Sequence, residues 1–228
     1  MNESEWLSGT DLEPLLRSVR GRASGRKLWL FAVACCRRIW HLLTDERSRR
    51  SVEAAQRLAD GLESDTDLGA AYDAAFAVFQ EQVALGGGTP VDWEAAYAPA
   101  PFAAAWVAHP DPDGDFPLDV AGYTAYALQA QSGPGTPEEA DQCRLLRDII
   151  GNPFRPVAFD PAWLRWNDGL VVRLAQSIYD DTRFEDLPIL ADALEEVGCA
   201  EPNILAHCRG GGEHVRGCWA VDLILGKC

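Results

Sequence analysis

The stretch GRKLWLFAVACCRRIWHLL, residues 25–43, gives the clearest indication of the fold class. Its apolar side chains cover most of the circumference of a helix, whereas a helix at a protein surface carries a single apolar stripe. Its charged residues come in pairs near the two ends, where long aliphatic stems can carry the charge to solvent. These residues are Arg26, Lys27, Arg37 and Arg38. The stretch therefore predicts a central, buried helix over 25–43.

The segments that follow carry start and stop signals of helices. Thr44 can cap a second helix that ends at Gly61, and Ser64 or Asp65 can begin a third that ends at the glycines of 86–88. Both segments are long enough for several turns. They predict two further helices beside the central one.

The C-terminal part is helical by the same criteria. Asp160 and Pro161 are expected to begin a helix whose apolar stripe runs as far as Ile178. Two short helices are expected over 202–208 and 214–225, on either side of a glycine turn. No alternating strand pattern accompanies them. The fold class predicted is therefore all-α, a compact multi-helix orthogonal bundle of about nine to eleven short and medium helices.

Two segments interrupt this pattern. Residues 86–119 are rich in Pro and Gly and predict an irregular segment, and SGPG at 132–135 is the best candidate boundary. The expected organisation is an N-terminal helical half, 1–132, with an acidic middle, and a C-terminal helical half, 136–228. The two halves form either separate domains or one domain around a shared core.

The net charge of −15 is unevenly distributed. Residues 17–57 hold eleven Arg and Lys against three acids, whereas residues 58–143 hold fifteen acids and no Lys or Arg. A basic helical patch can bind nucleic-acid phosphates, but the negative charge of the whole chain repels polyanions. We therefore expect the two blocks to face each other within the fold and do not expect a nucleic-acid partner.

Six arginines are candidates for a surface that binds a protein partner or a second copy of the chain. Five belong to the basic block and one to the segment NPFRPV. They are Arg37, Arg38, Arg47, Arg49, Arg50 and Arg155.

Seven cysteines without a disulfide spacing pattern indicate a reducing compartment, so a cytoplasmic location is expected. The longest apolar run, 28–36, has nine residues. A bilayer requires about twenty, so no membrane association is expected.

Three blocks of the sequence carry a resemblance to a protein family. They are EWL (5–7) leading into RKLWLFAVACCRRIWHLLTDERSRR (26–50), LLRDIIGNPFRPV (145–157) and HCRGGGEHVRGCWAVDLILGK (207–227). Together they resemble an uncharacterised family of helical proteins that is abundant in planctomycete bacteria. Trp29 departs from the family's usual run, which has a basic residue there. The resemblance implies a bacterial, cytoplasmic, helical protein, and it implies no activity, cofactor or catalytic residue.

A cluster near the C-terminus offers metal-binding chemistry. Five thiol and imidazole donors lie within twenty residues, which suits zinc, although their spacing matches no standard zinc motif. On one helix His214 and Cys218 would be i,i+4 neighbours, and His207 points about 100° away from Cys208. The predicted ligand set is Cys208, His214, Cys218 and Cys199. In the alternative reading these cysteines are small buried apolar residues.

Known catalytic motifs are missing from the sequence: it has no Walker loop, no dinucleotide fingerprint, no HExxH and no GxSxG. The leading hypothesis is a non-enzymatic cytoplasmic interaction or scaffold protein without a cofactor. One alternative is a zinc-stabilised helical protein that uses the C-terminal cluster. A further alternative is a thiol-dependent enzyme, which requires a cysteine of lowered pKa.

Overall fold

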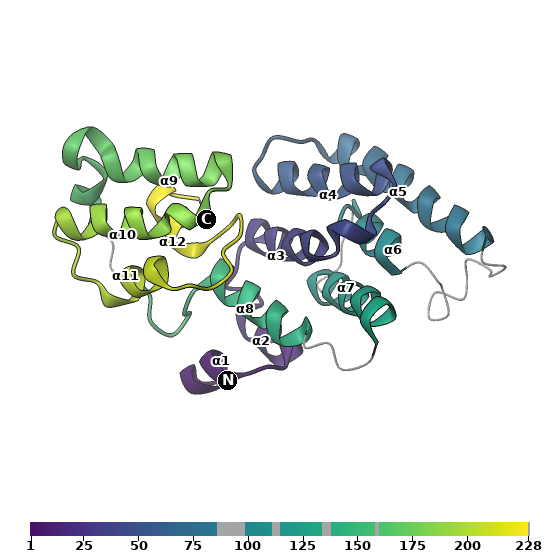
Figure 1. Ribbon diagram of the computed structural model, residues 1–228, viewed down its shortest axis with the longest axis horizontal. Coiled ribbons are helices and arrows are strands. Elements are labelled where there is room, and N and C mark those ends of the chain that lie inside the picture. Colours follow the sequence, from purple (N-terminus) through teal and green to yellow (C-terminus); the bar gives the residue numbers. More distant parts are fainter. Residues whose placement is uncertain (86–98, 111–114, 134–137, 158–159, 228) are drawn as a thin grey trace. The chain divides into compact units, whose positions relative to one another are not determined.

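A computed structural model describes residues 1–85, 99–110, 115–133, 138–157 and 160–227 (Figure 1). Within these ranges the chain forms twelve α-helices, four 3-10 helices and no strand. The predicted all-α class is confirmed. The irregular segment expected at 86–119 and the boundary expected at 132–135 lie partly outside the described residues.

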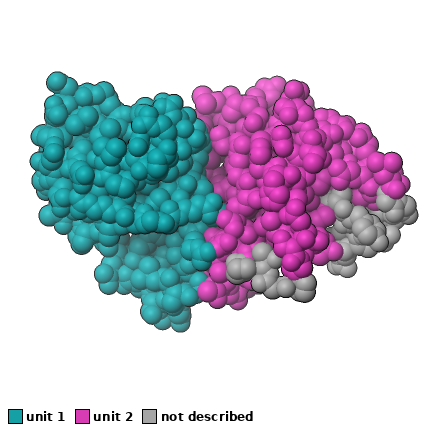
Figure 2. All heavy atoms as spheres, in the orientation of Figure 1, with its two compact units in different colours: residues 1–9, 144–228 teal, residues 10–143 magenta. Residues whose placement is uncertain are grey.

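The chain divides into two compact units (Figure 2). Unit 1 comprises residues 1–9 and 144–228, and unit 2 comprises residues 10–143. The N-terminal nine residues thus belong with the C-terminal part of the chain. The division falls inside helix α8 (Glu138–Ile150).

Unit 2 is organised around the helix that the opening stretch predicts. Helix α3 (Gly25–Arg38) contains seven consecutive buried residues, 30–36, and packs against three other α-helices of the unit. After Arg38 the chain tightens into a 3-10 turn instead of continuing to residue 43 as predicted. The helices of this unit before α8 are α2 (Leu12–Val19), α3, η1 (Trp40–Leu42), α4 (Glu46–Ala59), α5 (Asp65–Leu85), α6 (Pro99–Trp106) and α7 (Phe116–Ser132).

Small residues let α6 approach α3 and α4 closely. Ala103 and Ala104 of α6 are fully buried, and their carbonyl oxygens accept hydrogen bonds from neighbouring helices. Cys36 of α3 donates to the first at 3.7 Å, and Ser51 of α4 donates to the second at 2.6 Å. The cap of α4 differs from the prediction, because the side chain of Asp45 rather than Thr44 accepts the hydrogen bond from Arg47 N.

The basic and acidic blocks pair within unit 2. Arg38 binds Glu138 through two hydrogen bonds of 2.7 and 2.9 Å and also binds Asp141 at 2.6 Å. Further ion pairs between described residues also join the blocks. They are Arg20–Asp115, Arg26–Asp60, Arg47–Glu81 and Arg57–Glu63. The structure thus agrees with the expectation that the two blocks face each other.

The six candidate interaction arginines also have contacts within their own units. Arg37 and Arg49 lie over the ring of Trp40, at 4.1 and 5.4 Å from its centroid. The other four form ion pairs: Arg38 with Glu138 and Asp141, Arg47 with Asp45 and Glu81, Arg50 with Glu46, and Arg155 with Glu3. Their part in binding a partner stays a prediction.

Arg38→Ala is expected to lower the free energy of unfolding by about 3 kcal/mol, because it leaves the buried carboxylate of Glu138 without its partner. Arg50→Ala removes an exposed pair and should cost less than about 0.5 kcal/mol. Urea denaturation of the two variants measures both values. Equal losses would contradict a structural role for the buried pair.

Unit 1 has its own apolar core. Helix α9 (Leu170–Asp181) packs against α10 (Leu187–Glu196) and α12 (Trp219–Leu225), and α10 packs against α11 (Pro202–Arg209). The helix expected from Asp160 to Ile178 is broken, because Asn167, Asp168 and Gly169 adopt left-handed φ values of 47°, 53° and 75°. After α1 (Glu3–Ser8) and the end of α8, the elements are η2 (Pro161–Leu164), η3 (Trp166–Gly169), α9 (Leu170–Asp181), η4 (Phe184–Asp186), α10 (Leu187–Glu196), α11 (Pro202–Arg209) and α12 (Trp219–Leu225).

Throughout the part of the chain that the structure describes, none of the helices combines the length and the apolar composition needed to cross a membrane.

Candidate metal centre

The first residue of the site is an aspartate on a buried helix. Asp148 lies in the last two turns of α8, next to the fully buried Ile149, and its own side chain is only 5% exposed. Its Oδ2 accepts a hydrogen bond of 2.9 Å from the backbone N–H of Val215. One carboxylate oxygen is thereby fixed, and Oδ1 is directed at two histidines.

The second residue, His207, is placed by α11. Ile204 and Cys208 anchor one face of this helix in the core, and His207 lies beside that face. Its ring packs against Trp219, with 4.9 Å between the ring centroids. Its Nε2 lies 3.1 Å from Cys218 Sγ and 3.3 Å from Asp148 Oδ1.

The loop after α11 supplies the other two residues. Residues 210–218, all of them described, form a loop, so the prediction that His214 and Cys218 share a helix is wrong. Gly217 adopts a φ of 96°, in the left-handed region, and α12 begins only after Cys218. The loop nevertheless brings both side chains to the same place. His214 Nδ1 lies 2.6 Å from Asp148 Oδ1, and Cys218 is fully buried.

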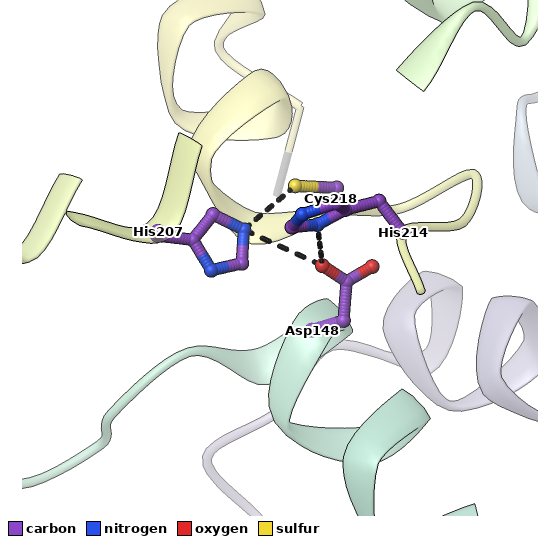
Figure 3. A group of neighbouring side chains, drawn as sticks. All are labelled: Asp148, His207, His214 and Cys218. Atoms are coloured by element: carbon purple, nitrogen blue, oxygen red, sulfur yellow. Dashed lines mark hydrogen bonds and ion pairs between the residues drawn. The ribbon is translucent and has the colours of Figure 1, made fainter. Parts of the chain in front are cut away.

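The four side chains converge on one point (Figure 3). Single donor atoms of Asp148, His207, His214 and Cys218 all lie within 4.8 Å of one another. This group is close enough to hold a metal ion. It combines one carboxylate oxygen, two imidazole nitrogens and one sulfur from three separate segments of unit 1.

The structure brings together two of the four predicted ligands. Cys199 and Cys208 lie in the apolar core of unit 1 and are not members of the four-residue group, as in the alternative reading of buried thiols. Asp148 and His207 were not predicted. His207 and Cys208 are adjacent in α11, and it is the histidine that belongs to the four-residue group. The signal for Asp148 was an acidic residue within the apolar run LLRDII.

Asp148 and His214 stabilise each other's charged forms, whereas the Asp148 charge opposes ionisation of Cys218. Burial raises the pKa of Asp148, but hydrogen bonds from His207 and His214 outweigh it and hold the pKa below its ordinary value. Burial lowers the pKa of His214, but the contact with Asp148 outweighs it and raises the pKa. Burial, with the nearby Asp148 charge, raises the pKa of the Cys218 thiol well above its usual range. The protein alone therefore favours an aspartate–histidinium pair beside a neutral thiol.

The orientation of His214 suits a metal ligand. Its Nε2 lies 3.4 Å from the backbone carbonyl oxygen of Gly210, and its Nδ1 is directed at Asp148 Oδ1. A proton between Nδ1 and Oδ1 accounts for the 2.6 Å that separates these atoms. A zinc ion with tetrahedral ligands at about 2.0 Å would replace the proton and separate the two atoms to about 3.3 Å.

Comparison of the chain with protein-family models, curated proteins and solved structures finds no match in any of the three. The resemblance to the planctomycete family accordingly stays a prediction.

Proposed function

We propose that this chain is a zinc-binding helical protein, in which unit 1 holds one zinc ion through Asp148, His207, His214 and Cys218. The observation that supports the proposal is the convergence of four donor atoms within 4.8 Å on side chains that are buried or nearly so. Buried groups of this polarity need a compensating partner, and a metal ion satisfies all four at once.

The donor set favours zinc over other common cations. Calcium and magnesium prefer oxygen ligands, whereas thiolate and imidazole suit zinc. A divalent ion also balances the charge, because the ligand set carries two negative charges once the Cys218 thiol has lost its proton. The buried site is then neutral overall, which reduces the cost of its burial.

The geometry favours a structural role for the ion. Four protein ligands fill a tetrahedral shell, whereas catalytic zinc sites keep one position open for water or substrate.

The thiol-dependent alternative has less support from the geometry. The same nitrogen of His207 faces both Cys218 and Asp148, whereas in a catalytic triad the two partners bind different nitrogens of the imidazole. All cysteines among the described residues are buried, and burial raises the pKa of Cys208 to about 12. None of the cysteines whose pKa shifts are resolved has the lowered pKa that an activated thiolate requires.

Metal analysis of the protein purified without a histidine tag tests the proposal. We expect about one equivalent of zinc per chain, and a cobalt-loaded sample should show a thiolate-to-cobalt charge-transfer band. Less than about 0.2 equivalents of zinc, both as isolated and after incubation with zinc, would exclude the site.

Acid is expected to release the ion, because protons compete with zinc for imidazole and thiolate ligands. Zinc retention should therefore fall steeply as the pH decreases below about 6, near the ordinary pKa of imidazole. Dialysis at stepped pH followed by metal analysis measures this release. Retention that does not change between pH 7 and pH 4 would contradict histidine ligation.

A further inference from the structure

Helix α1, at the start of the chain, is docked on the elements that form the metal site. With six residues it is too short to be stable in isolation, so its helical state depends on what it contacts. Trp6 is fully buried and donates a hydrogen bond of 3.1 Å from Nε1 to the backbone oxygen of Gly151. Arg147 of α8 donates to the carbonyl of Trp6 at 2.7 Å and also to that of Gly9.

Gly151 also lies against Trp219, a residue that packs on one of the proposed ligands. A Cβ atom at Gly151 would lie 3.0 to 3.3 Å from three atoms of the Trp219 indole, so the glycine approaches this ring closely. Trp219 in turn packs against His207. The residue after Arg147 is Asp148. Two short chains of contact therefore run from the proposed ligands to α1, one through Trp219 and Gly151 and the other along α8.

We propose that metal binding and the docking of α1 are coupled, so that zinc holds the N-terminal helix in place and loss of zinc loosens it. This inference rests on the proposed zinc site. Bound zinc fixes the His207 ring and the Asp148 carboxylate. It thereby fixes the surface of Trp219 on which Gly151 lies and the turn of α8 that presents Arg147. By reciprocity, docking of α1 must strengthen zinc binding by the same factor.

Hydrogen exchange of the full-length chain, with saturating zinc or with a chelator, tests the coupling. Backbone amides of residues 6–9 should exchange at least about fivefold more slowly with zinc, the lower end of typical coupling. Amides of α5, which belongs to unit 2, are the internal control and should not change. Equal exchange at residues 6–9 in a sample shown by metal analysis to contain zinc would overturn the coupling alone. A sample that binds no zinc would overturn the proposed site and the coupling together.

Zinc affinity of two tryptophan variants provides the reciprocal test. Trp6→Ala should weaken zinc binding at least about fivefold in a competition titration, although Trp6 is not one of the four proposed ligands. Trp163→Ala is the matched control, because Trp163 is a buried indole of the same unit outside α1, α8 and the site, and it should leave zinc affinity unchanged. If Trp6→Ala does not fold, Trp6→Phe keeps an aromatic ring but removes the N–H donor, and it should weaken binding in the same direction. Wild-type affinity in the folded Trp6 variant would overturn the coupling.

Discussion

Cys218→Ala is expected to reduce bound zinc from about one equivalent per chain to below about 0.2, because three remaining ligands hold zinc far less tightly than four. Stability should fall with it. At a free zinc concentration of 1,000 times Kd, zinc binding stabilises the folded state by about 4 kcal/mol, and the variant loses this contribution. Metal analysis and urea denaturation of the same samples measure the two effects.

Cys208→Ala is the matched control for this experiment. Both cysteines are fully buried in unit 1, and both substitutions remove one sulfur atom, but only Cys218 belongs to the four-residue group. The Cys208 variant should keep its zinc. A chelator should destabilise the wild type and the Cys208 variant and leave the Cys218 variant almost unchanged. If the Cys218 variant keeps its zinc as fully as the Cys208 variant does, Cys218 is not a ligand.

The fold was predictable where local composition determines the structure. The stretch 25–43 has no face without apolar side chains, and burial on all sides was therefore its only stable arrangement. Helix ends were less well predicted, because adjacent residues can compete for the same cap. Thr44 and Asp45 both offer a suitable oxygen, and in the structure the aspartate makes the hydrogen bond.

The break before α9 could not be read from periodicity. The apolar spacing from Trp163 to Ile178 continues through the interruption in the sequence, and residues on both sides of it, Trp163, Trp166, Leu174 and Ile178, pack in the core of unit 1. The three left-handed residues 167–169 include an asparagine, an aspartate and a glycine, which are the residues that best tolerate this conformation. Their sequence, NDG, was the available signal.

The metal site was only half predictable for a similar reason. Residues 207–218 are close in sequence, so their convergence could be expected from a tight glycine loop. Asp148 is 66 residues from His214, and only the packing of α8 brings it to the site. Choosing His207 rather than Cys208 required knowing which face of α11 enters the core. No local spacing rule contains that information.

Gly151→Ala is expected to destabilise unit 1 by about 2 to 4 kcal/mol, for two reasons that add. A φ of 76° costs an alanine about 1 kcal/mol or more, and the new methyl group would lie 3.0 Å from the Trp219 ring. Gly198→Ala is the matched control, because Gly198 also follows a helix with a positive φ, of 91°, but a Cβ there meets no atom within 4 Å. The control should lose only the conformational part, about 1 to 2 kcal/mol, in urea denaturation. The difference between the two variants therefore measures the contact of Gly151 with Trp219. Equal losses of unfolding free energy in the two variants would show that the Gly151–Trp219 contact is not tight enough to connect α1 with the zinc ligands.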